Sequence, residues 1–152
     1  MRILTVFCAA LGGALAAVSA LAQPFMGMMD PSWWQYAGRF TALSGDRAGE
    51  YSLYVHPSER SSGGETATAF AASVYDQQQL SQGHGSYWQM WESITFRCRE
   101  NKYLTTSFAF YNKPQTTGTS ADKLWEEQIP SADYSDVQPN SMGAAVMKIA
   151  CS

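Results

Sequence analysis

The three cysteines, Cys8, Cys98 and Cys151, have the widest range of chemistry in this 152-residue chain. A cysteine can act as a nucleophile, bind a soft metal or form a disulfide, and the compartment decides among these roles. Cys8 lies in an N-terminal segment that we expect to be removed on export. An even pair of cysteines in an exported chain predicts a disulfide, and closing the loop between Cys98 and Cys151 would stabilise the fold by about 4 kcal/mol. The alternative is two unpaired buried thiols.

The two histidines, His56 and His84, are the next candidates for chemistry. His84 stands between two glycines and is expected at a loop tip, where it would contact a ligand or be solvated. His56 precedes Pro57 and is interpreted as a strand-end residue. A zinc site would need at least one more ligand, and the chain lacks the His-Glu-x-x-His, Gly-x-Ser-x-Gly, phosphate-loop and dinucleotide motifs. The sequence therefore predicts no cofactor, no metal site and no catalytic residue.

One carboxylate, Glu92, interrupts the apolar face of an extended segment at 86–99. A buried carboxylate must be paired or protonated. Three explanations are open: a bulge turns Glu92 outward, an arginine such as Arg39 pairs with it, or Glu92 belongs to a binding groove. Functional sites are where a regular apolar pattern tends to be interrupted. The candidate ligand contacts are His84, Tyr87, Trp91 and Glu92.

The first 22 residues resemble a signal peptide, with a cationic start, an apolar run and the small residues Ala20 and Ala22 before the expected cleavage point. Residues 23–32 form an expected flexible lead-in, and 33–152 form one domain. Met26, Met28 and Met29 could offer thioethers to Cu(I), but a flexible tail is the favoured interpretation. We expect an exported protein that is periplasmic, on the outer surface or secreted, without a stable membrane span after cleavage.

Charge and composition exclude one class of partner. The net charge of the chain is −3, and it has no clustered basic patch of the kind that nucleic acid requires. Its 5 tryptophans, 8 tyrosines and 7 phenylalanines suit a sheet-rich domain or an adhesive surface. Nucleic acid is therefore not an expected partner, and a protein is.

Alternating apolar and polar residues predict strands, and the segment at 142–150 instead shows helical spacing. Residues 121–128 are also interpreted as a short helix, with Ser120 as its cap. The resulting fold class is α+β: an antiparallel sheet of about five to six strands, a C-terminal helix packed on one face, and one disulfide. The predicted strands lie at 33–43, 50–56, 66–75, 86–99 and 102–112.

Two short motifs carry a family resemblance. Phe96-Arg97-Cys98 ends one strand of the predicted hairpin, and Pro139-Asn140-Ser141 stands shortly before Cys151. Over residues 51–151 this arrangement resembles the surface-adhesin protein E family, small exported bacterial proteins. The resemblance implies an antiparallel sheet with its C-terminal helix tied by a disulfide between Cys98 and Cys151. The family takes its name from an adhesin that binds host extracellular-matrix proteins, but no defined matrix-binding motif is matched here, so the resemblance implies the fold more than that function.

The leading hypothesis is a non-catalytic binding module of the bacterial envelope or cell surface, with an envelope or host extracellular protein as its partner. The alternative is a small periplasmic enzyme or enzyme inhibitor. An enzyme would need Glu92 and His84, or a second carboxylate, to converge in a deep pocket, whereas an inhibitor would present a protruding loop at His84. A third hypothesis is an envelope component that forms a homodimer through a free strand edge.

Overall fold

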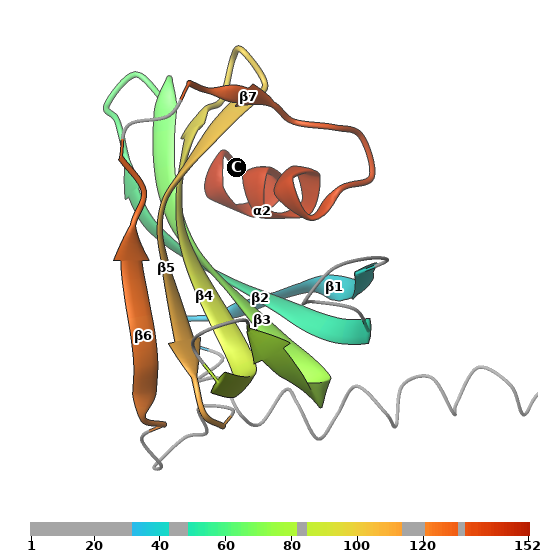
Figure 1. Ribbon diagram of the computed structural model, residues 1–152. Helices are drawn as coiled ribbons and strands as arrows, with labels where there is room; N and C mark the ends of the chain where they lie inside the picture. The colour runs from blue at the N-terminus through green and yellow to red at the C-terminus, as the bar shows by residue number, and fades with distance from the viewer. Residues whose placement is uncertain (1–31, 43–48, 82–84, 114–120, 131–132) are drawn as a thin grey trace, which may run out of the picture.

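A computed structural model describes residues 32–42, 49–81, 85–113, 121–130 and 133–152. These residues form one antiparallel sheet in the order β1-β2-β3-β4-β5-β6, with β7 paired to β5, and one helix, α2 (Figure 1). The predicted α+β fold is therefore confirmed, with β6 and β7 bringing the sheet to seven strands. The elements are β1 (Gln35–Ala42), β2 (Gly49–Arg60), β3 (Thr66–Ser81), β4 (Gly85–Arg97), β5 (Lys102–Tyr111), β6 (Lys123–Gln128), β7 (Ser135–Asp136) and α2 (Met142–Ala150).

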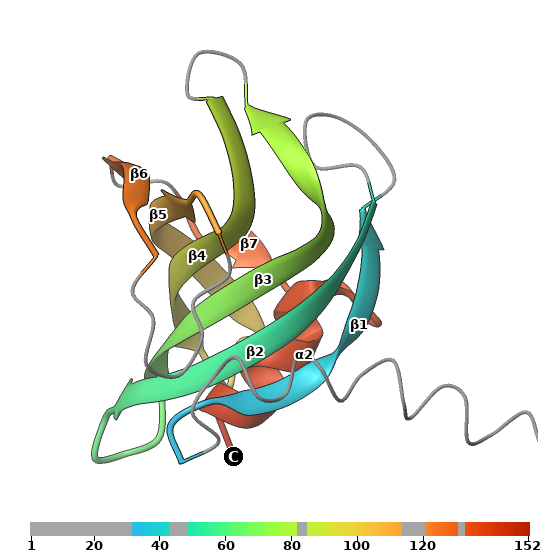
Figure 2. The same cartoon turned by 90° about the horizontal axis from the view of Figure 1, so that it is seen from below.

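The sheet is strongly curved and holds α2 on its concave side (Figures 1 and 2). Its ladders contain irregularities between Tyr36 and Gly38, between Pro57 and Glu59, and on β3 after Val74. Such bulges increase the local twist of a strand. Gly38 has a φ of 139°, which a residue with a side chain rarely adopts. The bulges bend the strands around the helix.

Two sequence predictions about individual elements are wrong. Residues 121–128 do not form a helix: Lys123–Gln128 is strand β6, and Trp125 stacks on Phe110 of β5 with ring centroids 5.3 Å apart. Tertiary pairing overrides a weak helical pattern here. β2 also continues through Pro57, since a bulge accommodates the missing N–H. His56 therefore lies inside a strand and not at its end.

Alternation along each strand divides the sheet into two faces. The inner face carries the main core, in which Leu53, Ile94 and Phe96 are fully buried against Val146 of α2. In the first half of β3 the inward positions are alanines, and such small side chains let a helix approach the sheet closely. These alanines are Ala67, Ala69 and Ala71.

The C-terminal helix and its disulfide follow the sequence prediction. Ser141 caps α2 by accepting a hydrogen bond from the Ala144 N–H at 3.1 Å. Cys98, just beyond β4, is bonded to Cys151, the residue that ends the helix, and the two Cα atoms are 5.8 Å apart. The predicted disulfide is confirmed, and it fastens the end of α2 to the end of β4.

Candidate functional site

The face of the sheet opposite α2 carries a continuous group of aromatic side chains. Tyr36 of β1 pairs in register with Tyr54 of β2, which pairs with Ala72 of β3, which pairs with Trp91 of β4. Because residues opposite one another across strands lie on the same face, this row crosses the sheet. We call the whole group the outer aromatic face: Trp33, Trp34, Tyr36, Tyr54, His56, Phe70, Trp91 and Tyr111.

Ring contacts connect six members of the outer aromatic face with one another, and Tyr36 contacts Tyr54 with ring centroids 5.6 Å apart. Trp34 packs against Trp91 with centroids 4.9 Å apart and against His56 at 5.6 Å. Trp91 continues to Tyr111 at 5.3 Å, and His56 stacks on Phe70 at 6.3 Å. These spacings lie in the range of favourable aromatic pairs, so the face has a defined arrangement.

His56 positions the two tryptophans that precede β1. Its Nδ1 lies 2.7 Å from the Trp33 carbonyl oxygen, so a protonated Nδ1 donates a hydrogen bond there. The rings of Trp33 and His56 meet edge to face at 5.8 Å. Trp33 nevertheless remains 62% exposed. The histidine therefore holds a large aromatic side chain at the surface of the sheet.

In the middle of the outer aromatic face the side chains are wholly or partly buried, and two of their polar groups make no hydrogen bond to the described residues. Tyr54 is 2% exposed, and neither its hydroxyl nor the Trp91 indole N–H has a hydrogen-bond partner among the described residues. Burial raises the pKa of Tyr54 to about 12, and the neighbouring Tyr36 adds a smaller contribution. Burial also raises the pKa of Tyr111. The face is therefore apolar in character as well as aromatic.

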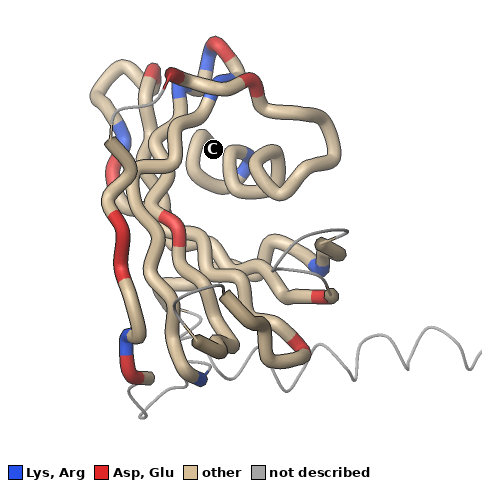
Figure 3. The backbone as a smooth tube through the Cα atoms, viewed as in Figure 1, with Lys and Arg blue, Asp and Glu red and all other residues tan. Residues whose placement is uncertain are grey.

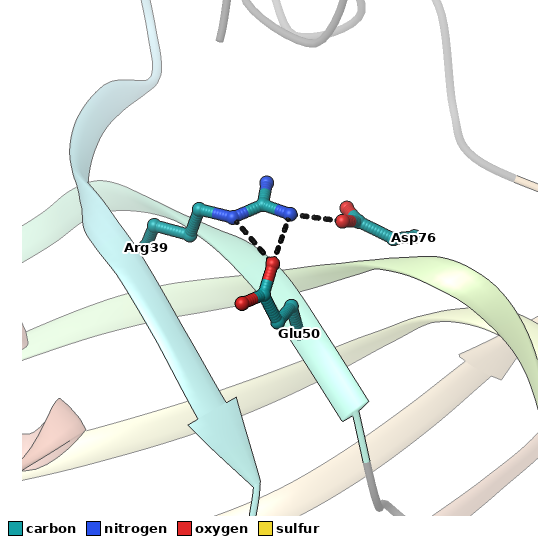
Figure 4. Close-up of polar contacts among 3 residues, drawn as sticks. All are labelled: Arg39, Glu50 and Asp76. Carbon is teal, nitrogen blue, oxygen red and sulfur yellow. Dashed lines mark hydrogen bonds and ion pairs between the residues drawn. The ribbon is translucent and has the colours of Figure 1, made fainter. Parts of the chain in front are cut away.

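Charges lie mainly at strand ends, in turns and along β6, while the middles of β1 to β3 carry few of them (Figure 3). At one end of the outer face Arg39 joins Glu50 and Asp76 (Figure 4). The Arg39 Nε and Nη2 donate to one Glu50 oxygen at 3.1 and 2.6 Å, and Nη2 also donates to Asp76. Hydrogen bonds to Glu50 and then Asp76 raise the Arg39 pKa. The guanidinium group of Arg39 is therefore already paired with two carboxylates of the sheet.

Of the four predicted contact residues, the three that the structure describes do not form one site. His84 lies outside the described residues. Tyr87 is 1% exposed and packs in the inner core against Phe110 at 4.8 Å, so it is a core residue and not a surface contact. Trp91 lies on the outer aromatic face, whereas Glu92 is 5% exposed on the inner face. Arg39, the expected partner of Glu92, binds Glu50 and Asp76 instead.

Sequence reasoning missed most of the outer aromatic face. The alternation of 50–56 places Tyr54 and His56 on one side of their strand, and that signal was available. What joins them to Trp91 is the register of β2, β3 and β4, which one sequence does not specify. Trp33 and Trp34 were assigned to the first strand, but they precede β1 and pack through His56.

The pH dependence of stability should report the burial of Tyr54. Its pKa is about 12 in the folded chain against an ordinary value of 10.0, so the unfolded chain loses this proton first as the pH rises. The free energy of unfolding should therefore fall as the pH passes through those values, by about 3 kcal/mol in total. Urea unfolding at about pH 9 and about pH 11 should show about half of this fall.

The Tyr54→Phe variant separates this tyrosine from the other titrating groups. At neutral pH we expect its stability to be unchanged or up to about 1 kcal/mol higher, because the hydroxyl that is removed has no hydrogen-bond partner among the described residues. At alkaline pH the variant should lose less stability than the wild type. Identical pH dependences for the two proteins would show that Tyr54 is not desolvated.

The described residues contain no group of three or more side chains suited to a metal ion. Within the same ranges, no helix has the length and apolarity needed to cross a membrane. The signal-peptide, lead-in and methionine-cluster predictions fall on residues 1–31, outside the described part of the chain, and stay predictions.

The fold and the disulfide define the class: a small α+β domain in which one curved antiparallel sheet holds a covalently fastened terminal helix. The sequence model of the family described as surface-adhesin protein E matches residues 40–152. This chain therefore belongs to the surface-adhesin protein E family, and membership implies an exported protein that binds other molecules. No curated protein and no solved structure matches the chain.

Proposed function

We propose that this protein is an exported, non-catalytic binding module that holds a protein partner on its outer aromatic face. The observation that carries the proposal is the register-aligned row of Tyr36, Tyr54, Ala72 and Trp91 across β1 to β4. Within the outer aromatic face, Trp33 is 62% exposed and Tyr36 38%. Tyrosine and tryptophan are enriched in protein interfaces and provide much of their binding energy. Family membership supports the same assignment.

A protein suits this face better than a small molecule or nucleic acid. The face extends over neighbouring long strands, and its arginine is already bound by two carboxylates. Protein interfaces have depleted charge at their centre and a polar rim, and here the ion pairs of Arg39 lie beside the row, displaced from it along the strands. The proposed partner is an envelope or host extracellular protein, met in the periplasm, at the outer surface or after secretion.

The arrangement of the described residues does not favour an enzyme. His56 lies on the outer face and Glu92 on the inner face, so the sheet separates a base from the buried carboxylate. General acid–base catalysis needs such groups within hydrogen-bond reach of one substrate. The enzyme or inhibitor alternative therefore depends on His84, which lies outside the described residues.

Capture with immobilised residues 23–152, from envelope extract and from culture supernatant, tests the proposal. Trp33→Ala and Trp91→Ala should each lower the affinity for the captured protein by about 30-fold, corresponding to about 2 kcal/mol for an interface hot spot. Trp33 is exposed, so its removal should leave the fold intact.

Leu80→Ala is the matched control, because Leu80 is 66% exposed at the end of β3 and stands outside the aromatic group. It should bind as the wild type does. A captured protein whose affinity is unchanged in both tryptophan variants would show that binding occurs elsewhere. Size-exclusion chromatography at two concentrations tests the homodimer hypothesis in parallel.

A further inference from the structure

The concave side of the sheet contains a second, chemically different feature. A pocket of about 280 Å³ lies between the inner face and the start of α2. Ligand pockets for drug-sized molecules span roughly 300–1,000 Å³, so this one suits a small ligand. Its lining combines one carboxylate, hydroxyl groups, aromatic rings and thioethers, from Tyr51, Ser73, Tyr75, Met90, Glu92 and Met142.

The acidic group of this pocket is Glu92. Glu92 pairs with Ala71 on β3 and with Phe108 on β5. The strands on both sides of Glu92 therefore place apolar side chains beside it. Glu92 is 5% exposed. A carboxylate at such a position is costly unless its charge is compensated. Glu92 also interacts within the protein, so a ligand would share this carboxylate with the fold.

Aromatic rings form one side of the same pocket. Tyr51 and Tyr75 lie with ring centroids 5.3 Å apart, and Phe40 stacks on Tyr51 at 5.8 Å. The faces of aromatic rings attract organic cations, most strongly where water is excluded. Met90 and Met142 add polarisable thioethers. No lysine, arginine or histidine is present among the described residues that line the pocket, so nothing in this lining repels a cation.

We propose that this pocket binds a small organic ammonium ion, with Glu92 as its counter-ion and the Tyr51 and Tyr75 rings against its alkyl groups. The site lies on the opposite face of the sheet from the outer aromatic face, and it does not depend on the proposed protein partner. It would make the module a receptor for a small cation as well as for a protein.

Titration of residues 23–152 with choline, ethanolamine and neutral 3,3-dimethyl-1-butanol tests the proposal. The neutral alcohol has the shape of choline but carries carbon in place of the charged nitrogen. We expect choline or ethanolamine to bind at least about tenfold more tightly than the alcohol. The methyl NMR signals of Met90 and Met142 should shift on binding, while that of Met147, which does not line the pocket, serves as the reference.

Two variants test whether the cation binds in this pocket. Glu92→Gln keeps the shape and removes the charge, and it should lower the affinity for the cation at least about tenfold. Ala42→Phe fills the pocket from the end of β1 and keeps Glu92, so it should also abolish binding. An unchanged Met147 signal verifies the fold of each variant, and capture of the protein partner should not change. Equal affinity for the neutral alcohol, no binding of either cation, or retained affinity in a folded variant would overturn the proposal.

Discussion

Replacing both bonded cysteines, Cys98→Ser with Cys151→Ser, is expected to lower the free energy of unfolding by about 4 kcal/mol. The disulfide closes a loop of 53 positions, and the constraint it places on the unfolded chain grows with the logarithm of loop length. Small domains have only about 5–15 kcal/mol of stability in total. Urea denaturation of residues 23–152 in the oxidised and the double-serine forms measures the difference.

The loss should concentrate on α2, since the bond joins the C-terminal end of the helix to the end of β4. Hydrogen exchange of the Val146 and Ala150 amides should therefore accelerate more than exchange in the centre of β3. Mass spectrometry after alkylation provides the control, because the exported wild type should expose no reactive thiol from Cys98 or Cys151. Equal urea midpoints for the two forms would contradict the stabilising role.

The parts of the fold that the sequence predicted are those specified by local signals. The β4–β5 hairpin follows from two alternating segments that are close in sequence. Arg97 pairs with Lys102, so the connection is the four residues 98–101 and not the expected two, and Asn101 takes a positive φ of 54° there. The terminal helix has its Ser141 cap, and the disulfide follows from pairing two cysteines in an exported chain. Each signal lies within a few residues or is covalent, so a single sequence contains it.

The errors arise where pairing between distant segments decides the outcome. The β3–β4 register shifts between Val74 and Gln79. Tyr87 and Met90 are three residues apart, so regular alternation would place them on opposite faces, yet both lie in the inner core. A shift of one residue exchanges the two faces of a strand. Strict alternation therefore assigned Tyr87 to the surface, and only the irregular ladder reveals its burial.

The sequence identified some residues of the candidate site but not which face of the sheet each occupies. Trp91 and Glu92 were identified as exceptional residues of one strand, and they do stand out in the structure. As neighbours on a strand they point to opposite faces, so they belong to two different features. The outer aromatic face and the inner pocket therefore require separate tests, and a variant of one should leave the other intact.

Phe96→Ala should have the second large effect on stability, a loss of about 3–5 kcal/mol. Phe96 is fully buried on the inner face, between Ala67 of β3 and Tyr103 of β5 in the strand register. Ala67 is too small to fill the space that a missing ring leaves, and the disulfide two residues further along restrains any collapse of α2 onto the sheet. Urea denaturation measures the loss, and Phe96→Leu, which keeps most of the apolar volume, should lose much less.

Combining Phe96→Ala with the double-serine variant tests whether the ring and the disulfide act on the same element. Cys98 and Cys151 pack against the core cluster that contains Phe96, and contacting groups are generally non-additive in their effects. Without the bond, α2 is free to settle into the cavity, so the combined loss should be smaller than the sum of the two separate losses. Additive losses would mean that the helix keeps its position without the covalent link, and that packing against the sheet alone fixes it.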